Sequence, residues 1–328
     1  MSTPIFDRST LKTKPLSERI HDLNQDAILG LEAPGTFEHQ EKMQIVAQKI
    51  IQANKEGNST IMMMGGHVIR SGVQNYIIDL MTRGYIGCLA MNGSGIIHDF
   101  ELALIGATTE SVARYIQTGE FGLWTETGYL NDIINKAFQS DPNIGMGEAV
   151  GQAILDGDYP FKSISLLAAA QKLNTPVTVH VGVGYDIIHE HPNCDGAATG
   201  ALSFNDFLKF TEIVGNLEDG VVMNFGSAVM APEVFLKALS MARNVAHQNN
   251  REIRHFTTMV CDLFELPEDY KSEAPKDQPG YYFRPWKTML VRTVADGGQS
   301  IYVSGKHAQT IPALWAAINA SERSTPPK

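Results

Sequence analysis

The sequence predicts an α/β protein in which an open parallel sheet carries helices on both faces. Three observations lead to this class: short apolar runs, longer segments of helical periodicity between them, and glycine turns where the apolar runs end. Strands that alternate with helices of about ten or more residues form βαβ units, whose strands are parallel. We expect strands at residues 59–64, 86–91, 176–182, 220–225, 255–261 and 300–304.

The segments between the apolar runs show the spacing of amphipathic helices. In the first of them, Met43, Val46 and Ile50 recur at intervals of three and four residues, which places them on one helix face. Ser203 is a good N-cap, and Pro232 suits the first turn of a helix. We expect helices at residues 37–55, 71–83, 98–106, 126–138, 147–156, 163–174, 203–215, 232–249, 286–295 and 310–320.

The chain divides into an arm, one domain and a tail. Residues 1–36 contain several prolines and little periodicity, and we expect this arm to pack on a partner subunit. Residues 37–322 are predicted to form a single α/β domain, and residues 323–328 a short tail. The polar stretch 265–283 is predicted to be a loop, and a loop of that length usually serves function or an interface.

Composition narrows the classes of partner. The chain has 328 residues and a formal net charge of -10, which argues against general nucleic-acid binding and suits small cationic ligands. No apolar run approaches the roughly 20 residues of a membrane helix, and the first residues lack an apolar signal core. The three cysteines lack CxxC spacing, so we expect a reduced, cytoplasmic setting, with Cys88 and Cys261 in the core.

Glycine turns follow three of the predicted strands. Gly65 and Gly66 follow the first strand, Asn92-Gly93-Ser94-Gly95 follows the second, and Gly226-Ser227 follows the fourth. Ligands of open parallel sheets bind beyond the carboxyl ends of the strands, where glycine lets the backbone approach closely. Neither of the first two turns matches a GxGxxG fingerprint or a P-loop, so a dinucleotide site and ordinary turn chemistry both remain open. His98 and Asp99 begin a predicted helix. An acidic residue in the first turn interacts favourably with the helix dipole, which is one interpretation, and contact with a ribose or an amine is another.

A polar cluster follows the predicted strand at 176–182. It contains Asp186, His189, His191 and Cys194. A substrate pocket that uses Asp186 and His191 is one interpretation, since histidine transfers protons near neutral pH. A zinc site of His189, His191 and Cys194 is a second, and a solvated loop is a third.

A further cluster, at residues 281–292, combines aromatic side chains with Trp286, Lys287 and Arg292. Such a group can form a pocket for an amine or an anion, or a contact between subunits. Lys287 would be a nucleophile only if desolvation lowered its pKa.

The order of these motifs resembles deoxyhypusine synthase. The matching stretches are His67-Val-Ile-Arg-Ser71-Gly72, Asn92 through Asp99, Tyr185-Asp186-Ile-Ile-His-Glu-His191, Gly226 through Val229, and Ile301 through Leu314. The resemblance implies a Rossmann-like fold, NAD as cofactor and a homotetramer assembled as a dimer of dimers. It also implies a transferase that removes hydride from a polyamine such as spermidine and forms an imine on a lysine.

The resemblance also implies roles for individual residues. It gives Asp186, His191 and Lys287 catalytic roles, and it adds His98 and Trp286 to Asp186 and His191 as substrate-binding residues. The implied cofactor-binding residues are Gly65, Gly66, Ser71, Asn92, Gly93, Ser94, Gly95, Asp99, Gly226 and Ser227.

One departure from this family and a second resemblance leave other functions open. The family's lysine motif, Glu-Ala-Val-Ser-Trp-Gly-Lys, is replaced here by Pro285-Trp286-Lys287-Thr288. The stretch His98 through Gly106 also resembles the NAD-binding domain of archaeal-type ornithine cyclodeaminases. The alternatives are therefore an NAD-dependent cyclodeaminase and a catalytically inactive oligomer that binds a nucleotide or an amine. A zinc-dependent hydrolase is the remaining one.

Overall fold

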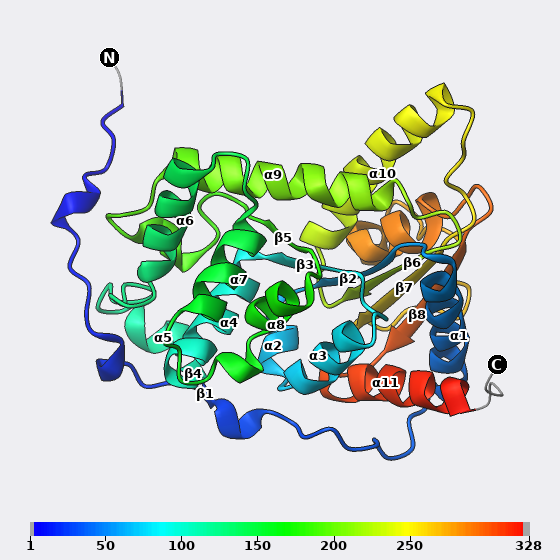
Figure 1. Cartoon of the computed structure of the whole chain (residues 1–328), viewed down its shortest axis with the longest axis horizontal. Coiled ribbons are helices and arrows are strands. Elements are labelled where there is room, and N and C mark those ends of the chain that lie inside the picture. Colours follow the sequence, from blue (N-terminus) through cyan, green and yellow to red (C-terminus); the bar gives the residue numbers. More distant parts are fainter. Residues whose placement is uncertain (1–2, 324–328) are drawn as a thin grey trace.

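The computed structural model describes residues 3–323 and shows a six-stranded parallel sheet between two layers of helices (Figure 1). The sheet order is β5-β3-β2-β6-β7-β8, and every neighbouring pair is parallel. In chain order these strands are the third, second, first, fourth, fifth and sixth, which is the strand order of dinucleotide-binding Rossmann folds. The predicted fold class and all six predicted strands are confirmed. The strands are β2 (Thr60–Met64), β3 (Cys88–Asn92), β5 (Val177–His180), β6 (Val221–Phe225), β7 (Thr257–Asp262) and β8 (Gln299–Ser304).

Alternate side chains of the central strand enter two separate cores. Met62 and Met64 of β2 belong to the larger core, and Ile61 and Met63 belong to the smaller one on the opposite face. The larger core is covered by α1 (Gln40–Glu56), α2 (Gly66–Arg70), α3 (Gln74–Thr82), α4 (Gly93–Ile105), α6 (Tyr129–Ser140), α7 (Met146–Asp156), α8 (Leu166–Leu173) and α11 (His307–Arg323). The smaller core is covered by α10 (Met230–Gln248), the π-helical segment η7 (Pro285–Arg292) and the second half of α9 (Gly196–Val214). The first half of α9 contributes Ala198 and Leu202 to the larger core.

Cys88 and Cys261 are buried in β3 and β7, as predicted.

The remaining elements are short. They are β1 (Leu23–Asn24), β4 (Ala107–Thr108), α5 (Val112–Tyr115), η1 (Arg8–Thr10), η2 (Leu16–Glu18), η3 (Gln25–Ala27), η4 (Lys162–Ile164), η5 (Ile187–Glu190) and η6 (Pro279–Tyr282).

Two predicted helices near the glycine turns have different bounds. The helix predicted at 71–83 begins only at Gln74, as α3, because Gly72 adopts φ 72° and separates it from α2. A Cβ on Gly72 would lie 2.0 Å from the Ala27 carbonyl oxygen. The helix predicted from residue 98 begins at Gly93. Its N-cap is Asn92, whose Oδ1 accepts a hydrogen bond from Gly95 N at 3.2 Å.

The prediction that Ser203 caps a helix is wrong. Helix α9 begins at Gly196 after the N-cap Asp195, and Ser203 lies inside it, where its hydroxyl donates to Val179 O at 2.8 Å. The helix predicted at 286–295 is the π-helical segment at 285–292. Pro232 lies in the first turn of α10, as predicted, and the other predicted helices lie within a few residues of observed ones.

The N-terminal arm packs on its own chain. Leu16 is buried with Tyr115 and Trp124, and β1 pairs antiparallel with β4. Arg19 is buried as well and donates two hydrogen bonds to Glu101, at 2.8 and 2.7 Å. Packing of the arm on a partner subunit stays a prediction, and of the predicted tail only Arg323 is described, as the last residue of α11.

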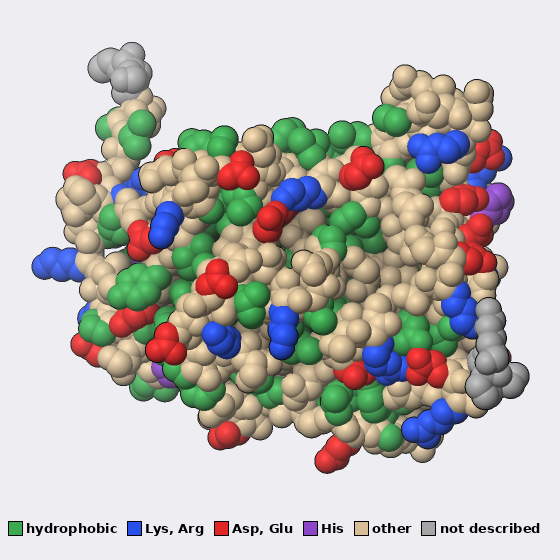
Figure 2. Space-filling view, viewed as in Figure 1, with side chains coloured by type: hydrophobic (Ala, Val, Ile, Leu, Met, Phe, Trp, Pro, Cys, Tyr) green, Lys and Arg blue, Asp and Glu red, His purple; other side chains and the backbone are tan. Residues whose placement is uncertain are grey.

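Apolar side chains remain exposed on α9, where Figure 2 shows them along the upper edge of the molecule. Phe204 and Leu208 of this helix are 58% and 42% exposed. The predicted homotetramer stays a prediction. Within residues 3–323, no helix combines the length and apolar character needed to cross a bilayer.

Candidate functional site

A cavity of about 480 Å³ opens at the point where the strand order of the sheet reverses, beyond the carboxyl ends of β2, β3, β5 and β6. The crevice at such a switch point is where doubly wound folds bind their ligands. Loops that are far apart in sequence meet here, and the lining includes eight of the predicted site residues. They are Gly65, Gly66, Asn92, Gly93, Ser94, Asp186, Gly226 and Ser227.

The glycine turns form a tight cradle because their backbones pack against one another. A Cβ on Gly66 would lie 2.5 Å from Ser94 Oγ, and one on Gly65 would lie 2.9 Å from Gly226 O. Gly226 adopts φ 64°, and a Cβ there would lie 2.4 Å from His307 Nε2. Only glycine therefore satisfies these three positions without a shift of the neighbouring groups.

The first turn of α4 also faces the cavity. Asn92 caps this helix, so Gly93 and Ser94 are its first residues, and both line the cavity. The first backbone N–H groups of a helix lack partners within the helix and attract negative charge. The end of β3 therefore offers hydrogen-bond donors to a ligand.

Asp186 is the acidic residue of the cavity wall. Its carboxylate lies against Gly93, so that a Cβ on Gly93 would be 2.0 Å from Asp186 Oδ2. This oxygen is buried and has no hydrogen-bond partner within residues 3–323. Burial raises the pKa of Asp186 to about 6. A buried carboxylate without a cation is unfavourable, so this side chain is suited to a positively charged ligand group.

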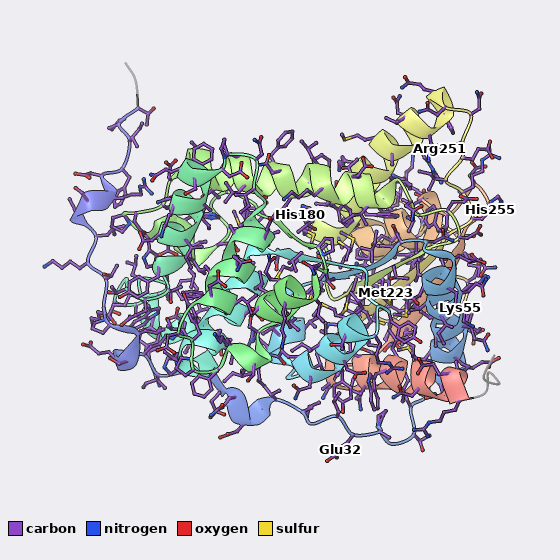
Figure 3. The ribbon with its side chains drawn as sticks, in the orientation of Figure 1. Glu32, Lys55, His180, Met223, Arg251 and His255 are labelled. Carbon is purple, nitrogen blue, oxygen red and sulfur yellow. The ribbon has the colours of Figure 1, made fainter. Side chains whose placement is uncertain are left out.

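Two histidines line the same cavity. His180, the last residue of β5, lies beside α9 (Figure 3), where its ring meets Phe210 edge to face at 5.4 Å. Its Nε2 is 3.0 Å from Thr178 Oγ1, and burial lowers its pKa to about 4, which keeps the imidazole neutral. His67, the second residue of α2, is more exposed, and burial followed by the charge of Arg70 lowers its pKa.

Neither histidine was among the predicted site residues. The signal for His180 was its place at the carboxyl end of a strand that already carried Asp186 in the following loop.

Lys287 and Trp286 do not line the cavity. Both are buried in η7, where the Lys287 Nζ lies 3.6 Å from the centroid of the Tyr281 ring. The Trp286 indole N–H donates to Tyr270 O at 2.7 Å. The structure therefore does not bring these two residues together with Asp186.

Four other predicted residues also have partners outside the cavity. His191 Nε2 is 2.8 Å from Gly122 O, and Asp99 accepts hydrogen bonds from Ser165 Oγ at 2.5 Å and Leu166 N at 2.7 Å. These contacts join loops and hold the first turn of α8. Ser71 and Gly95 act locally: the Ser71 hydroxyl donates to His67 O, and Gly95 packs against Met91.

A second cavity of about 260 Å³ adjoins the first and shares Ser94, Tyr185 and Asp186 with it. His98 lies here, with its Nδ1 2.8 Å from Thr108 Oγ1. Burial lowers the pKa of His98 to about 4, so it is neutral. The predicted substrate-binding residues His98 and Asp186 therefore share this smaller cavity.

The zinc alternative finds no support in the geometry. The part of the chain that is described holds no group of three or more His, Cys, Asp or Glu side chains able to bind a metal ion. His189 and His191 serve separate contacts: His189 Nδ1 accepts from Asp186 N at 3.3 Å, whereas His191 contacts Gly122.

Comparison with known proteins gives similarity at the level of the fold. No known protein family and no curated protein matches the sequence. Among solved structures, AgrE in complex with ornithine and NAD⁺ aligns with 88% of this chain at a TM-score of 0.51 and 11% identity. ArgZ, an arginine dihydrolase from the ornithine–ammonia cycle in cyanobacteria, aligns with 89% at a TM-score of 0.50 and 13% identity.

The alignments cover 34% and 33% of AgrE and ArgZ, so this chain corresponds to about a third of either protein. A third structure, provisionally assigned as a deoxyhypusine synthase from Entamoeba histolytica, aligns over 87% of this chain and 90% of its own. Its TM-score is 0.46 and its identity 11%, too low to support an argument. The similarities to AgrE and ArgZ establish the fold alone.

Proposed function

We propose that this chain is an NAD-dependent enzyme that acts on a small amine or amino acid by oxidising a carbon that carries nitrogen. The observation that supports this proposal most strongly is the pairing of two features in one cavity. A glycine cradle at the switch point suits a dinucleotide, and the unpartnered Oδ2 atom of Asp186 suits an ammonium group.

The residues present fit NAD. The volume of about 480 Å³ lies within the range of roughly 300–1,000 Å³ that small-molecule and cofactor sites occupy. The turn Gly65–His67 follows β2, the first strand of the six-stranded sheet in chain order. This is where the fold binds a pyrophosphate through backbone N–H groups. Asn92 ends the second strand, close to where an acidic residue holds a ribose in many relatives of the fold. These two turns would hold the cofactor, together with Gly226 and Ser227, which line the same cavity.

When bound, NAD⁺ would supply a hydride acceptor. The chain's own residues must bind the amine and manage its proton. An ammonium nitrogen has no lone pair, so it must lose a proton before its carbon can be oxidised. Asp186 Oδ2 is placed to hold this nitrogen and accept the proton. His180, which lines the same cavity, stays neutral and can order a water molecule or the substrate without adding charge.

The finer prediction of an aminobutyl transfer through an imine on Lys287 is not part of this proposal, because Lys287 lies in η7 against Tyr281. A role in amine oxidation rests on the cavity. The binding of ornithine and NAD⁺ by AgrE supports it by analogy of fold.

The test combines cofactor binding with a panel of amines. We expect calorimetry to show NAD⁺ binding to the wild-type chain, and NADH absorbance to rise with one of spermidine, putrescine, agmatine or ornithine. Gly66→Ala should weaken NAD⁺ binding at least about tenfold because its Cβ meets Ser94. The matched control is Gly200→Ala, whose Cβ meets no atom within 4 Å. No binding of NAD⁺ at millimolar concentration by the wild-type chain would overturn the proposal.

A further inference from the structure

The second cavity has an unusual balance of charged side chains. Its deepest charged groups, Arg19 and Glu101, neutralise each other through two hydrogen bonds. Hydrogen bonds from Thr108 and Thr127 complete the shell of Glu101. This pair is self-contained, so it forms a neutral floor and leaves the other ionisable groups of the cavity to a ligand.

The remaining charged groups of the lining are Arg70, Glu110 and Asp186, and none of them forms an ion pair within residues 3–323. Arg70 lies at the exposed rim, where its Nη1 is 3.3 Å from His67 Nε2. The neutral His98 adds no charge. Two carboxylates face one rim cation, so the cavity carries excess negative charge.

Glu110 is held in place by neutral donors. Its Oε2 accepts from the Trp124 indole N–H at 2.8 Å, and its Oε1 accepts from Gly122 N at 3.1 Å. Burial raises the pKa of Glu110, although these hydrogen bonds act in the opposite direction. Each carboxylate oxygen keeps a lone pair for a further donor. The side chain is therefore oriented but not neutralised.

Thr109, next to Glu110, gives a second and independent sign of a ligand. It adopts φ 65°, which is rare for a β-branched residue, and its hydroxyl is buried without a partner within residues 3–323. The residue is 9% exposed and lines the cavity. The arm holds this conformation, since Asp22 N donates to Thr109 O at 3.1 Å. Strain of this kind is typical of ligand sites.

We infer that the second cavity is a subsite for the far end of the substrate, in which Glu110 and the Thr109 hydroxyl bind a second amino group. The substrate then carries two amino groups: one reacts beside Asp186, where the two cavities meet, and the other enters the smaller cavity. Ile97, Phe121 and Ile187 also line this cavity, and such apolar side chains suit the methylene chain that joins two amino groups. The reaction at Asp186 rests on the proposed function, whereas the selection by Glu110 depends on binding alone.

Two matched pairs of ligands isolate the second amino group. L-Ornithine and L-norvaline share a carbon skeleton and differ in the terminal amine, and putrescine and butylamine differ in the same way. We expect calorimetry on the full chain to show, in at least one pair, a preference of about tenfold or more for the ligand with two amino groups. Equal affinity within both pairs, including no binding of any of the four, would overturn the inference without any variant.

The variant Glu110→Gln keeps the size of the side chain and removes its charge. It should abolish the preference by weakening ornithine or putrescine, while norvaline and butylamine bind as before. The control Glu120→Gln removes a carboxylate that pairs with Lys14 outside the cavity, and it should leave the preference intact. A preference that survives in Glu110→Gln would overturn the role of Glu110.

The same titrations without and with NAD⁺ separate this inference from the proposed function. Selective diamine binding by a chain that does not bind NAD⁺ would support the subsite and reject the oxidative function. NAD⁺ binding with no selectivity for a second amino group would support the oxidative function and reject the subsite.

Discussion

The carboxylate of Asp186 lies directly over the Cα of Gly93, so close that a Cβ on Gly93 would be 2.0 Å from Asp186 Oδ2. The contact joins the loop after β5 to the first residue of α4, across neighbouring strands of the sheet. It places a buried acid at the end of a helix whose first N–H groups favour negative charge. The absence of a side chain on Gly93 therefore leaves room for the carboxylate of Asp186.

Replacing Gly93 with alanine should therefore affect Asp186 before it affects the fold. We expect Gly93→Ala to displace the carboxylate and to reduce amine-dependent NADH formation by about 100-fold, or about 2.7 kcal/mol. Overpacking should lower the free energy of unfolding by about 1–3 kcal/mol. Rates of NADH formation and urea melts check the two effects, and an unchanged rate would contradict the role of this contact.

Gly200 provides the opposite case. It lies inside α9, and a Cβ there would meet no atom within 4 Å. Gly200→Ala should raise the free energy of unfolding by about 0.5–1 kcal/mol, since alanine loses less backbone entropy in a helix. Urea denaturation measures the change, and destabilisation would show that the position is less open than the structure indicates.

The buried ion pair of Arg19 and Glu101 should matter far more than pairs at the surface. Burial alone would raise the pKa of Glu101, but the hydrogen bonds and charge of Arg19 hold it below its ordinary value. Arg19→Ala leaves this carboxylate buried and unpaired, which should cost about 3–5 kcal/mol of unfolding free energy. Lys209→Ala, which breaks an exposed pair with Glu148, should cost less than about 1 kcal/mol. Equal effects in thermal melts would contradict the difference.

The buried carboxyl of Asp206 should contribute stability that is lost as the pH rises from about 4 to about 7. Burial raises the pKa of Asp206 to about 7, whereas an unfolded aspartate titrates near ~3.9. Within this window the folded chain holds a proton that the unfolded chain has released, so the free energy of unfolding decreases with pH. Asp99 and Asp186, with pKa values of about 6, act in the same direction.

The variant Asp206→Asn tests this dependence. Its amide oxygen can still accept from Gly147 N and Val179 N, which now donate to Asp206 Oδ2 at 2.9 and 2.8 Å. We expect the variant to lose less stability, or gain more, than the wild-type chain as the pH rises from about 4 to about 7. Denaturation curves across this range give the answer, and identical slopes would exclude Asp206 as the source.

The sheet could be predicted from sequence because each parallel strand is a short apolar run bounded by turn residues. Helix boundaries were harder where glycine was involved. Gly93 and Gly95 have poor helix propensity, so the pattern indicated a turn, yet Asn92 caps a helix that includes both. Ser203 has the chemistry of an N-cap, but its hydroxyl satisfies a strand carbonyl instead.

The site was predicted most reliably where position at the end of a strand decided it. Gly65, Asn92 and Gly226 lie at or just after strand ends, and the carboxyl ends of parallel strands meet by geometry alone. His191 and Lys287 lie in segments whose direction depends on tertiary packing, and they have partners elsewhere. Residue type suggested chemistry for both, but it carried no information about where their side chains would point.

The arm has a consequence for the order of folding. Arg19 leaves the ribosome 82 residues before Glu101, and β1 must await β4. The arm is synthesised before the helix that receives it, so it docks only after that helix has formed. A chain that lacks residues 1–27 would lose Arg19, which would leave Glu101 uncompensated. It would also lose the hydrogen bond from Asp22 that holds Thr109, and the smaller cavity would lose part of its wall.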